Sequence, residues 1–166
     1  VWDAERQLGP LCDDLFARAD DALSEKHDRA PHFLGAIVIR QVSTYGDEVP
    51  CHDVIDGQQR LTTFQIIIAA LRDIAREAKA DAVADELDTY TRNKGMMARP
   101  EEEQFKVWPT EADIAYFTDV VSLGSREALE RQYPIVIKRK KQQPRPVIVE
   151  AYTFFHDKFR SYIASD

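Results

Sequence analysis

Residues 54–63 read Val-Ile-Asp-Gly-Gln-Gln-Arg-Leu-Thr-Thr, and the hydrophobic pattern changes its period within this stretch. Before Gly57, segments 33–39 and 51–55 are short runs typical of strands, the first buried, and they are expected to pair as a hairpin with a long loop. After Gly57, apolar residues recur every three or four positions to about Ala80, which indicates one buried face of a helix. That face comprises Leu61, Phe64, Ile67, Ile68, Leu71, Ile74 and Ala75. The stretch is therefore predicted to be a strand-to-helix turn.

The remaining segments favour helices around this turn. Helical spacing predicts one helix over 8–23 with Pro10 in its first turn, and another over 82–91. Further helices are expected after Thr110, which is the predicted cap, and from Pro146 onward. Segment 96–104 is expected to be a loop and 105–108 a short strand. Inward-facing residues are predicted to be Val83, Leu87 and Tyr90 in the second helix, and Ile114, Phe117 and Val121 in the third. The predicted fold class is α+β, a small mixed sheet covered by helices.

Composition excludes several classes of protein. The 166 residues carry a net charge of −7, so no overall positive field attracts the chain to nucleic acid or to an anionic membrane. Cys12 and Cys51 are far apart and have no metal-ligand spacing, which argues against a disulfide framework or a zinc site. No apolar run approaches the roughly 20 residues that a membrane-spanning helix needs. A cytoplasmic location is expected, and the start at Val1 suggests a piece of a longer protein.

The turn itself has the residues to hold an anion. The first backbone N–H groups of a helix lack intrahelical partners, and together with the helix dipole they favour a negative charge. Gly57 permits a positive φ or close approach of a ligand to the backbone. Gln58 and Gln59 offer neutral amides, and Arg60 offers a planar set of donors that matches a phosphate. The hydroxyls of Thr62 and Thr63 follow one turn later.

Asp56 is the one anion of this group, so it is the candidate ligand for a divalent cation or the residue that orients an attacking water. A purely structural interpretation is also open. In that case Asp56 caps the helix, Gly57 serves a tight turn, and Arg60 pairs with a surface carboxylate such as Glu77 or Asp53.

Residues 56–63, preceded by the Phe-Leu-Gly-Ala-Ile-Val run 33–38 and followed by an apolar helix, resemble the DGQQR-motif family. This family is the GmrSD restriction endonuclease N-terminal domain, also called domain-of-unknown-function family 262. The resemblance covers residues 1–120 well and the C-terminal helix loosely. It implies a fold like that of ParB and sulfiredoxin, in which an arginine at an equivalent turn holds nucleotide phosphates. Several members resemble NTP-hydrolysing components of bacterial defence against modified phage DNA.

By this resemblance the cofactor is a nucleoside triphosphate with Mg²⁺, and each residue of the turn has an expected role. Arg60 holds phosphate, Asp56 positions the cation or the water, and Gln58 and Gln59 orient the ligand or the nucleophile. The expected catalytic residues are Asp56, Gln59 and Arg60, and the expected nucleotide-binding residues are Gly57, Gln58, Arg60, Thr62 and Thr63. The nucleotide-binding domain is expected to span 1–124, a basic loop or lid 125–145, and a C-terminal helix 146–166, which packs on the domain or leads to a further one.

The chain departs from the family pattern in two ways. Members carry a short strand before the tryptophan matched by Trp2, so the domain is expected to be truncated at its N-terminal edge and to bind nucleotide weakly. Many members also continue into a His-Asn-His nuclease domain. The histidines here show no such grouping, so nuclease activity is expected in a partner domain and not in this chain. They are His27, His32, His52 and His156.

A basic run offers a second function of a different class. Lys138, Arg139, Lys140, Lys141 and Arg145 are consistent with a solvated loop or with contacts to a DNA backbone. In the second case the chain is a non-catalytic DNA-binding or scaffold module that tethers a partner nuclease. Trp108 is interpreted as a packing residue, and base stacking beside Asp56 is the open alternative for it.

Overall fold

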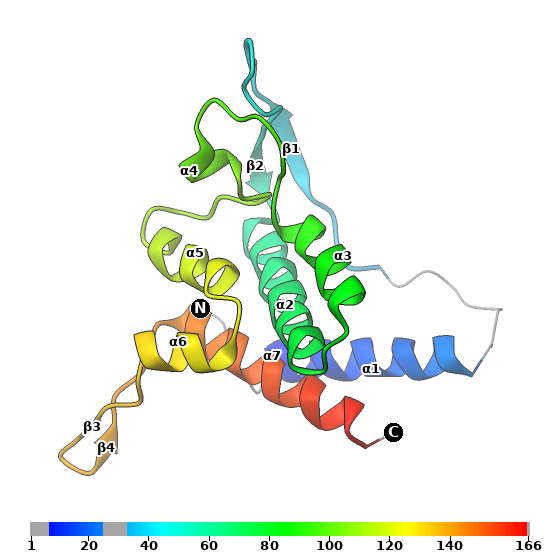
Figure 1. The fold of residues 1–166 in the computed structure, drawn as a ribbon, viewed down its shortest axis with the longest axis vertical. Helices are drawn as coiled ribbons and strands as arrows, with labels where there is room; N and C mark the ends of the chain where they lie inside the picture. Colours follow the sequence, from blue (N-terminus) through cyan, green and yellow to red (C-terminus); the bar gives the residue numbers. More distant parts are fainter. Residues whose placement is uncertain (1–6, 25–32, 166) are drawn as a thin grey trace.

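The computed structural model describes residues 7–24 and 33–165 and confirms the α+β class (Figure 1). Instead of one mixed sheet covered by helices, the described residues form two separate antiparallel ribbons of two strands each. Trp2, His27 and His32 lie outside the described residues. The elements are α1 (Gly9–Leu23), β1 (Val38–Gln41), β2 (His52–Asp56), α2 (Gln58–Glu77), α3 (Asp81–Thr91), α4 (Pro100–Glu103), α5 (Ile114–Ser122), α6 (Arg126–Gln132), β3 (Ile137–Lys138), β4 (Lys141–Gln142) and α7 (Val147–Ile163).

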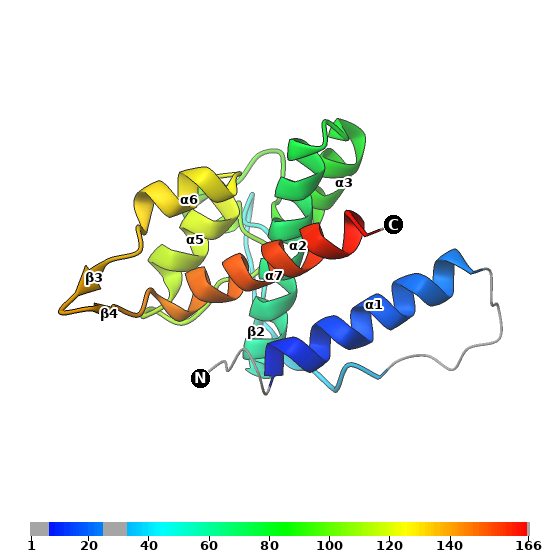
Figure 2. The same cartoon turned by 90° about the horizontal axis from the view of Figure 1, so that it is seen from below.

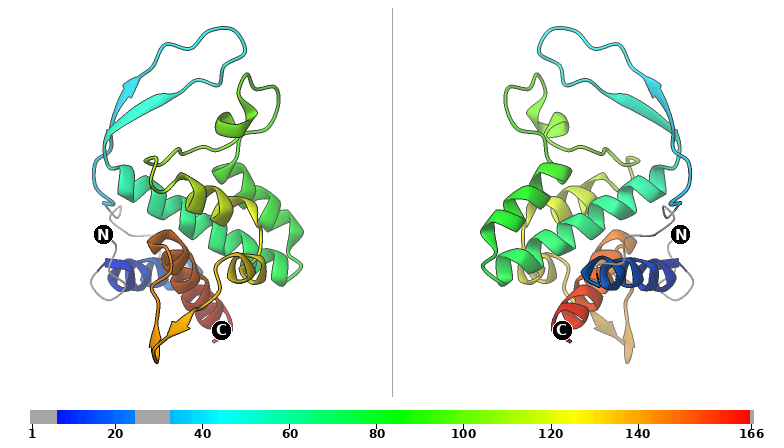
Figure 3. Two further views of the ribbon diagram at one scale, coloured as in Figure 1. Left: turned by 90° about the vertical axis from the view of Figure 1, so that its left-hand side faces the viewer. Right: turned by 90° about the vertical axis from the view of Figure 1, so that its right-hand side faces the viewer.

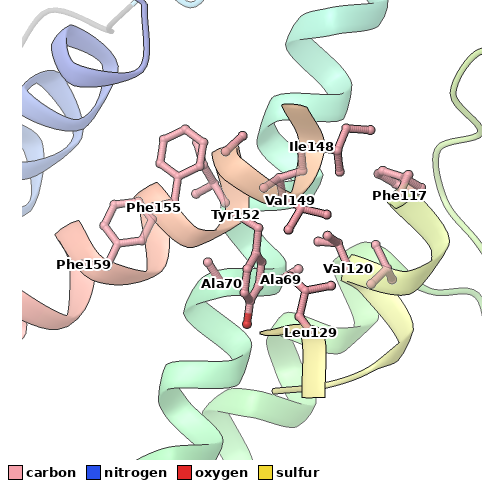
Figure 4. Packing of buried hydrophobic residues seen from close by; sticks show 14 of the residues in the cluster. Ala69, Ala70, Phe117, Val120, Leu129, Ile148, Val149, Tyr152, Phe155 and Phe159 are labelled. Atoms are coloured by element: carbon pink, nitrogen blue, oxygen red, sulfur yellow. The ribbon is translucent and has the colours of Figure 1, made fainter. Parts of the chain in front are cut away.

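Helix α2 is the centre of the core. Helix α3 lies alongside it, α7 crosses it, and α5 packs near the crossing (Figures 1 and 2). Ala69 and Ala70 are fully buried at this crossing, where their small side chains allow a close approach of Val149 and Tyr152 from α7 (Figure 4). Phe155 continues the same buried row of α7. Burial of this row of α7 side chains is the main contribution to the stability of the core, since it removes apolar area from water.

A charged side chain is also part of this core. Arg72 of α2 is fully buried, and its Nε donates to Asp73 at 2.9 Å. Its Nη1 donates to Asp88 of α3 at 3.2 Å and to the carbonyl of Val121 of α5 at 2.8 Å. The hydroxyl of Tyr152 of α7 donates to Asp73 at 2.8 Å. A buried charge is tolerated only when it is paired in this way, so the network ties four helices together.

Several local predictions were wrong. The run 33–39 becomes a strand only from Val38, and all four residues of β1 are exposed. In α3, Val83 and Tyr90 are exposed, whereas Ala84 and Thr91 are buried on the same face as Asp88, which accepts from Arg72 of α2. Segment 96–104 contains the short helix α4, and segment 105–108 contributes only one isolated bridge, from Phe105 to Arg92.

The C-terminal third also differs in part. Helix α5 begins at Ile114, with Asp113 as its N-cap residue, so Thr110 lies one turn before the helix and does not cap it. Phe117 and Val121 are fully buried, as predicted. The expected loop 125–145 contains α6 and the β3–β4 ribbon. No helix in the described part of the chain is long and apolar enough to cross a membrane.

The hydroxyl of Tyr152 tests the buried network. Burial and the neighbouring charge of Asp73 raise the pKa of this hydroxyl, so it stays protonated and donates at any ordinary pH. Tyr152→Phe leaves a buried carboxylate oxygen without its donor, and we expect a loss of about 1–3 kcal/mol in the free energy of unfolding, measured in denaturant. The matched control is Tyr116→Phe, whose hydroxyl has no hydrogen bond to any described residue and should change stability by less than about 0.5 kcal/mol. Equal effects of the two substitutions would contradict this role.

Candidate functional site

The turn between β2 and α2 has the geometry expected of an anion-binding helix start. Strand β2 ends at Asp56, and Gly57 takes a left-handed conformation with φ 95° as the N-cap residue of α2. The amide of Leu61 donates to the carbonyl of Gly57, whereas no described group accepts from the amides of Gln58, Gln59 or Arg60. Three backbone donors therefore remain free at the positive end of a 20-residue helix.

Arg60 lies back across the backbone that leads into β1. Its Nη1 donates to the carbonyl of Ala36. A Cβ atom built on Gly35 would lie 2.6 Å from the guanidinium carbon of Arg60, and one on Gly57 would lie 3.3 Å from its Nη1. Both glycines have positive φ values of 94° and 95°. The guanidinium therefore occupies space that two side-chain-free residues leave open.

Gly35 is a site residue that the sequence reading missed. The signal was present, because an isolated glycine within a strand-like run indicates a bulge or a close approach by another group. The approaching group is Arg60, 25 positions further along the chain. The apolar run 33–38 and the Asp-Gly-Gln-Gln-Arg motif thus form one unit of structure.

The structural alternative for Arg60 is not observed. Asp53 pairs with Arg40 across the ribbon, and Glu77 pairs with His156 and Arg160 at the far end of α2. Arg60 is half-buried and bonds only to a neutral carbonyl among the described residues. Because a guanidinium has five N–H donors, most of its donors remain available to an anion.

The structural alternative for Asp56 is not observed either. Its side chain is exposed, does not cap α2, and has no hydrogen bond or ion pair with the described residues. Gln59 is also exposed, and its amide has no described partner. Gln58 differs, since its side-chain amide donates to the carbonyl of Val54 at 2.7 Å. Asp56 and Gln59 thus have no side-chain partner among the described residues and, like the remaining donors of Arg60, are free to meet a ligand.

Thr62 and Thr63 already have structural partners. Their hydroxyls donate to the carbonyls of Gln58 and Gln59 at 2.9 Å and 2.8 Å, which are bonds to the preceding helical turn. Both side chains are almost fully buried. Contact with a ligand therefore falls mainly to residues 56–60.

The turn is open to solvent. A hollow of about 290 Å³ lies against α7, with Leu8 at its edge, and another of about 220 Å³ lies at the foot of the β3–β4 ribbon. Neither contains a residue of the motif. Trp108 packs against Phe105 with ring centroids 5.7 Å apart. A ligand at the turn would consequently be held by phosphate contacts more than by enclosure of a base.

The basic run is separate from the motif. Residues 138–141 form the end of the β3–β4 ribbon, which extends from the side of α6 and α7 away from the β1–β2 ribbon (Figures 1 and 3). No cluster of three or more carboxylate, cysteine or histidine side chains suited to a metal occurs among the described residues. The structure brings 35–37 and 56–60 together and leaves 138–141 apart.

Substitution of Gly35 tests the packing of Arg60. Gly35→Ala places a methyl group on the guanidinium, and we expect hydrogen-exchange protection of the β1–β2 ladder to fall about 10- to 100-fold, the equivalent of a lost charge-assisted hydrogen bond. Gly46→Ala is the matched control, because Gly46 also has a positive φ in the same hairpin and a Cβ there would meet no atom within 4 Å.

Gly35→Ala should lower the hydrogen-exchange protection of the β1–β2 ladder more than Gly46→Ala does. This difference should disappear in an Arg60→Ala background, because the added methyl group then has no guanidinium to clash with. If the excess persisted without the arginine side chain, the guanidinium would not be what Gly35 accommodates.

Comparison with known proteins gives a family but no individual relative. No curated protein matches the chain, and no solved structure matches it. Residues 1–166 match the family described as GmrSD restriction endonuclease, N-terminal domain. Since the match spans the whole sequence, the chain belongs to the family of GmrSD restriction endonuclease N-terminal domains.

Proposed function

We propose that the turn 56–60 binds a nucleoside triphosphate with a divalent cation and hydrolyses it. The observation that supports this proposal is the combination of three free amides at the start of α2 with a preoriented Arg60 beside them. Free helix-start amides bind phosphate groups in many proteins, and a guanidinium adds charge-assisted bonds to the same oxygens.

The residues of the turn have different roles in this proposal, which follow from their chemistry. The amides of 58–60 and the guanidinium of Arg60 bind phosphate oxygens. Gln59 has an amide free to orient the terminal phosphate or an attacking water. Gln58 is fixed to Val54, so its contribution is to hold the turn in shape.

A divalent cation fits the one free carboxylate of the turn. Mg²⁺ in nucleotide sites is bound by one or two carboxylates together with substrate phosphates and water, so the single exposed carboxylate of Asp56 is sufficient. The cation would neutralise charge on the phosphates when bound. Asp56 is therefore expected to matter more for turnover than for binding.

The family gives this activity a context. The chain is a domain of a restriction and defence protein, and such a domain implies a nuclease domain in the full protein. We infer that the nucleotide cycle controls that nuclease, which cleaves modified phage DNA in the cytoplasm. The similarity of the fold to ParB and sulfiredoxin remains a prediction. The boundaries 1–124, 125–145 and 146–166 of the three expected units also remain predictions.

Titration calorimetry with nucleoside triphosphates and Mg²⁺ tests the proposal. Arg60→Ala should weaken binding about 10- to 100-fold, because it removes a charge-assisted contact to phosphate. Asp56→Asn should retain more of the binding and lose hydrolysis. Arg40→Ala is the control, since Arg40 is an exposed arginine of the same ribbon that pairs with Asp53 and should leave binding unchanged.

Two results would overturn the proposal. One is binding that Arg60→Ala leaves intact while Arg40→Ala weakens it. The other is the absence of binding for all four nucleoside triphosphates to a protein whose β1–β2 ladder is protected from hydrogen exchange, since the turn would then be formed and still not bind.

A further inference from the structure

The positive charge of the β3–β4 ribbon is concentrated in an otherwise acidic chain. Lys138, Arg139, Lys140 and Lys141 are consecutive and exposed, and none has an ion pair with a described residue. The whole sequence nevertheless carries a net charge of −7. A surface of this kind produces a local positive field at one end of the molecule, where it steers a polyanion.

The tip of the ribbon has an unfavourable backbone and unfavourable charge pairing. Arg139 and Lys140 form its two-residue turn with φ values of 50° and 61°, although such turns favour asparagine and glycine. Lys138 and Lys141 are directly opposite each other in the ladder, where like charges repel. A bound polyanion would offset this repulsion.

The foot of the ribbon is fixed to the helical body. The amide of Gln143 donates to the carbonyl of Val136 at 2.8 Å, below the ladder. Arg145 donates to both carboxylate oxygens of Glu150 in α7, at 2.9 Å and 3.3 Å. This hydrogen bonding from Arg145 holds the pKa of Glu150 below its usual value, so the pair is ionised at neutral pH. Arg145, the fifth basic residue of the run, is thus paired within the molecule. The tip residues 138–141 project from the foot of the ribbon, which these bonds hold to α7 (Figure 2).

We propose that this ribbon tip, residues 138–141, binds the phosphate backbone of double-stranded DNA. A two-stranded β-ribbon fits the major groove of a duplex, and its Lys and Arg side chains reach the flanking phosphates. The tip has no aromatic side chain on which unpaired bases could stack, which disfavours single strands. The choice of DNA rests on the proposed role in restriction. The nucleotide turn lies elsewhere on the molecule, so each surface can be disabled separately.

Charge substitutions that preserve the turn test this proposal. Arg139→Asn/Lys140→Gly removes two charges while giving the turn its preferred residues, so the ribbon should be at least as well formed. Lys138→Gln/Lys141→Gln removes the other two. The control is Lys94→Gln/Lys106→Gln, which removes two exposed lysines outside the ribbon.

Binding of a short fluorescent duplex is measured by anisotropy against salt concentration. Four phosphate contacts predict a slope of log K against log salt of roughly −3 to −4, or about a 100-fold loss between about 50 and about 200 mM salt. Each tip double substitution should weaken binding and reduce the slope by about 2, and the control should change neither.

The proposal fails if the unsubstituted protein does not bind the duplex, if the tip variants bind with an unchanged slope, or if single-stranded RNA of equal length binds more tightly than the duplex.

Calorimetry with nucleoside triphosphate on the same variants separates the two proposals. Nucleotide binding retained after loss of DNA binding supports independent surfaces, whereas loss of both on tip substitution contradicts the assignment to the ribbon.

Discussion

The hydrogen bond from Arg60 to the carbonyl of Ala36 holds the β1–β2 ribbon against the start of α2. A two-stranded hairpin is only marginally stable by itself, and most residues of this one are exposed. The contact is possible because Gly35 and Gly57 have no side chains on either side of the guanidinium. One arginine therefore fixes the shape of the turn and presents its remaining donors beside the free amides of α2.

The same helix connects this turn to the core. Its first turn carries residues 58–60, its middle carries the buried alanines at the α7 crossing, and Arg72 lies in the following turn. Arg72 bonds to α3 and α5, and its neighbour Asp73 accepts from Tyr152 of α7, so α2 cannot rotate or slide without leaving buried charges unpaired. A rigid α2 keeps its amide donors in a fixed direction, which is the preorganisation that anion binding and catalysis need.

The sequence predicted the turn well because its signals are local. The change of period at Gly57 located the end of β2 and the start of α2, and a positive φ was one of the two properties for which a glycine was expected in this turn. Other features depend on distant partners. The sequence marks Gly35 as unusual in a strand-like run, but the group that it accommodates, Arg60, lies 25 positions away and is identified only by the fold. Arg72 was not expected in the core because arginine is mostly exposed.

The wrong predictions for the run 33–39 and for the basic run also have physical causes. The run 33–39 is apolar, as buried strands are, yet this ribbon is covered by no described helix and its apolar residues stay exposed. The basic run gave no turn signal, because its two left-handed residues, Arg139 and Lys140, are neither glycine nor asparagine.

The central claim is that the amides of 58–60, Arg60 and the backbone at Gly35 form one binding surface. Its most direct test is an NMR titration of nucleoside triphosphate with Mg²⁺, following the backbone amides of the described residues and the Nε–Hε signal of Arg60. We expect the largest shifts at 57–60 and, through the guanidinium, at 35–36. Shifts confined to the hollow against α7 or to the β3–β4 ribbon, with the Arg60 signal unmoved, would contradict it.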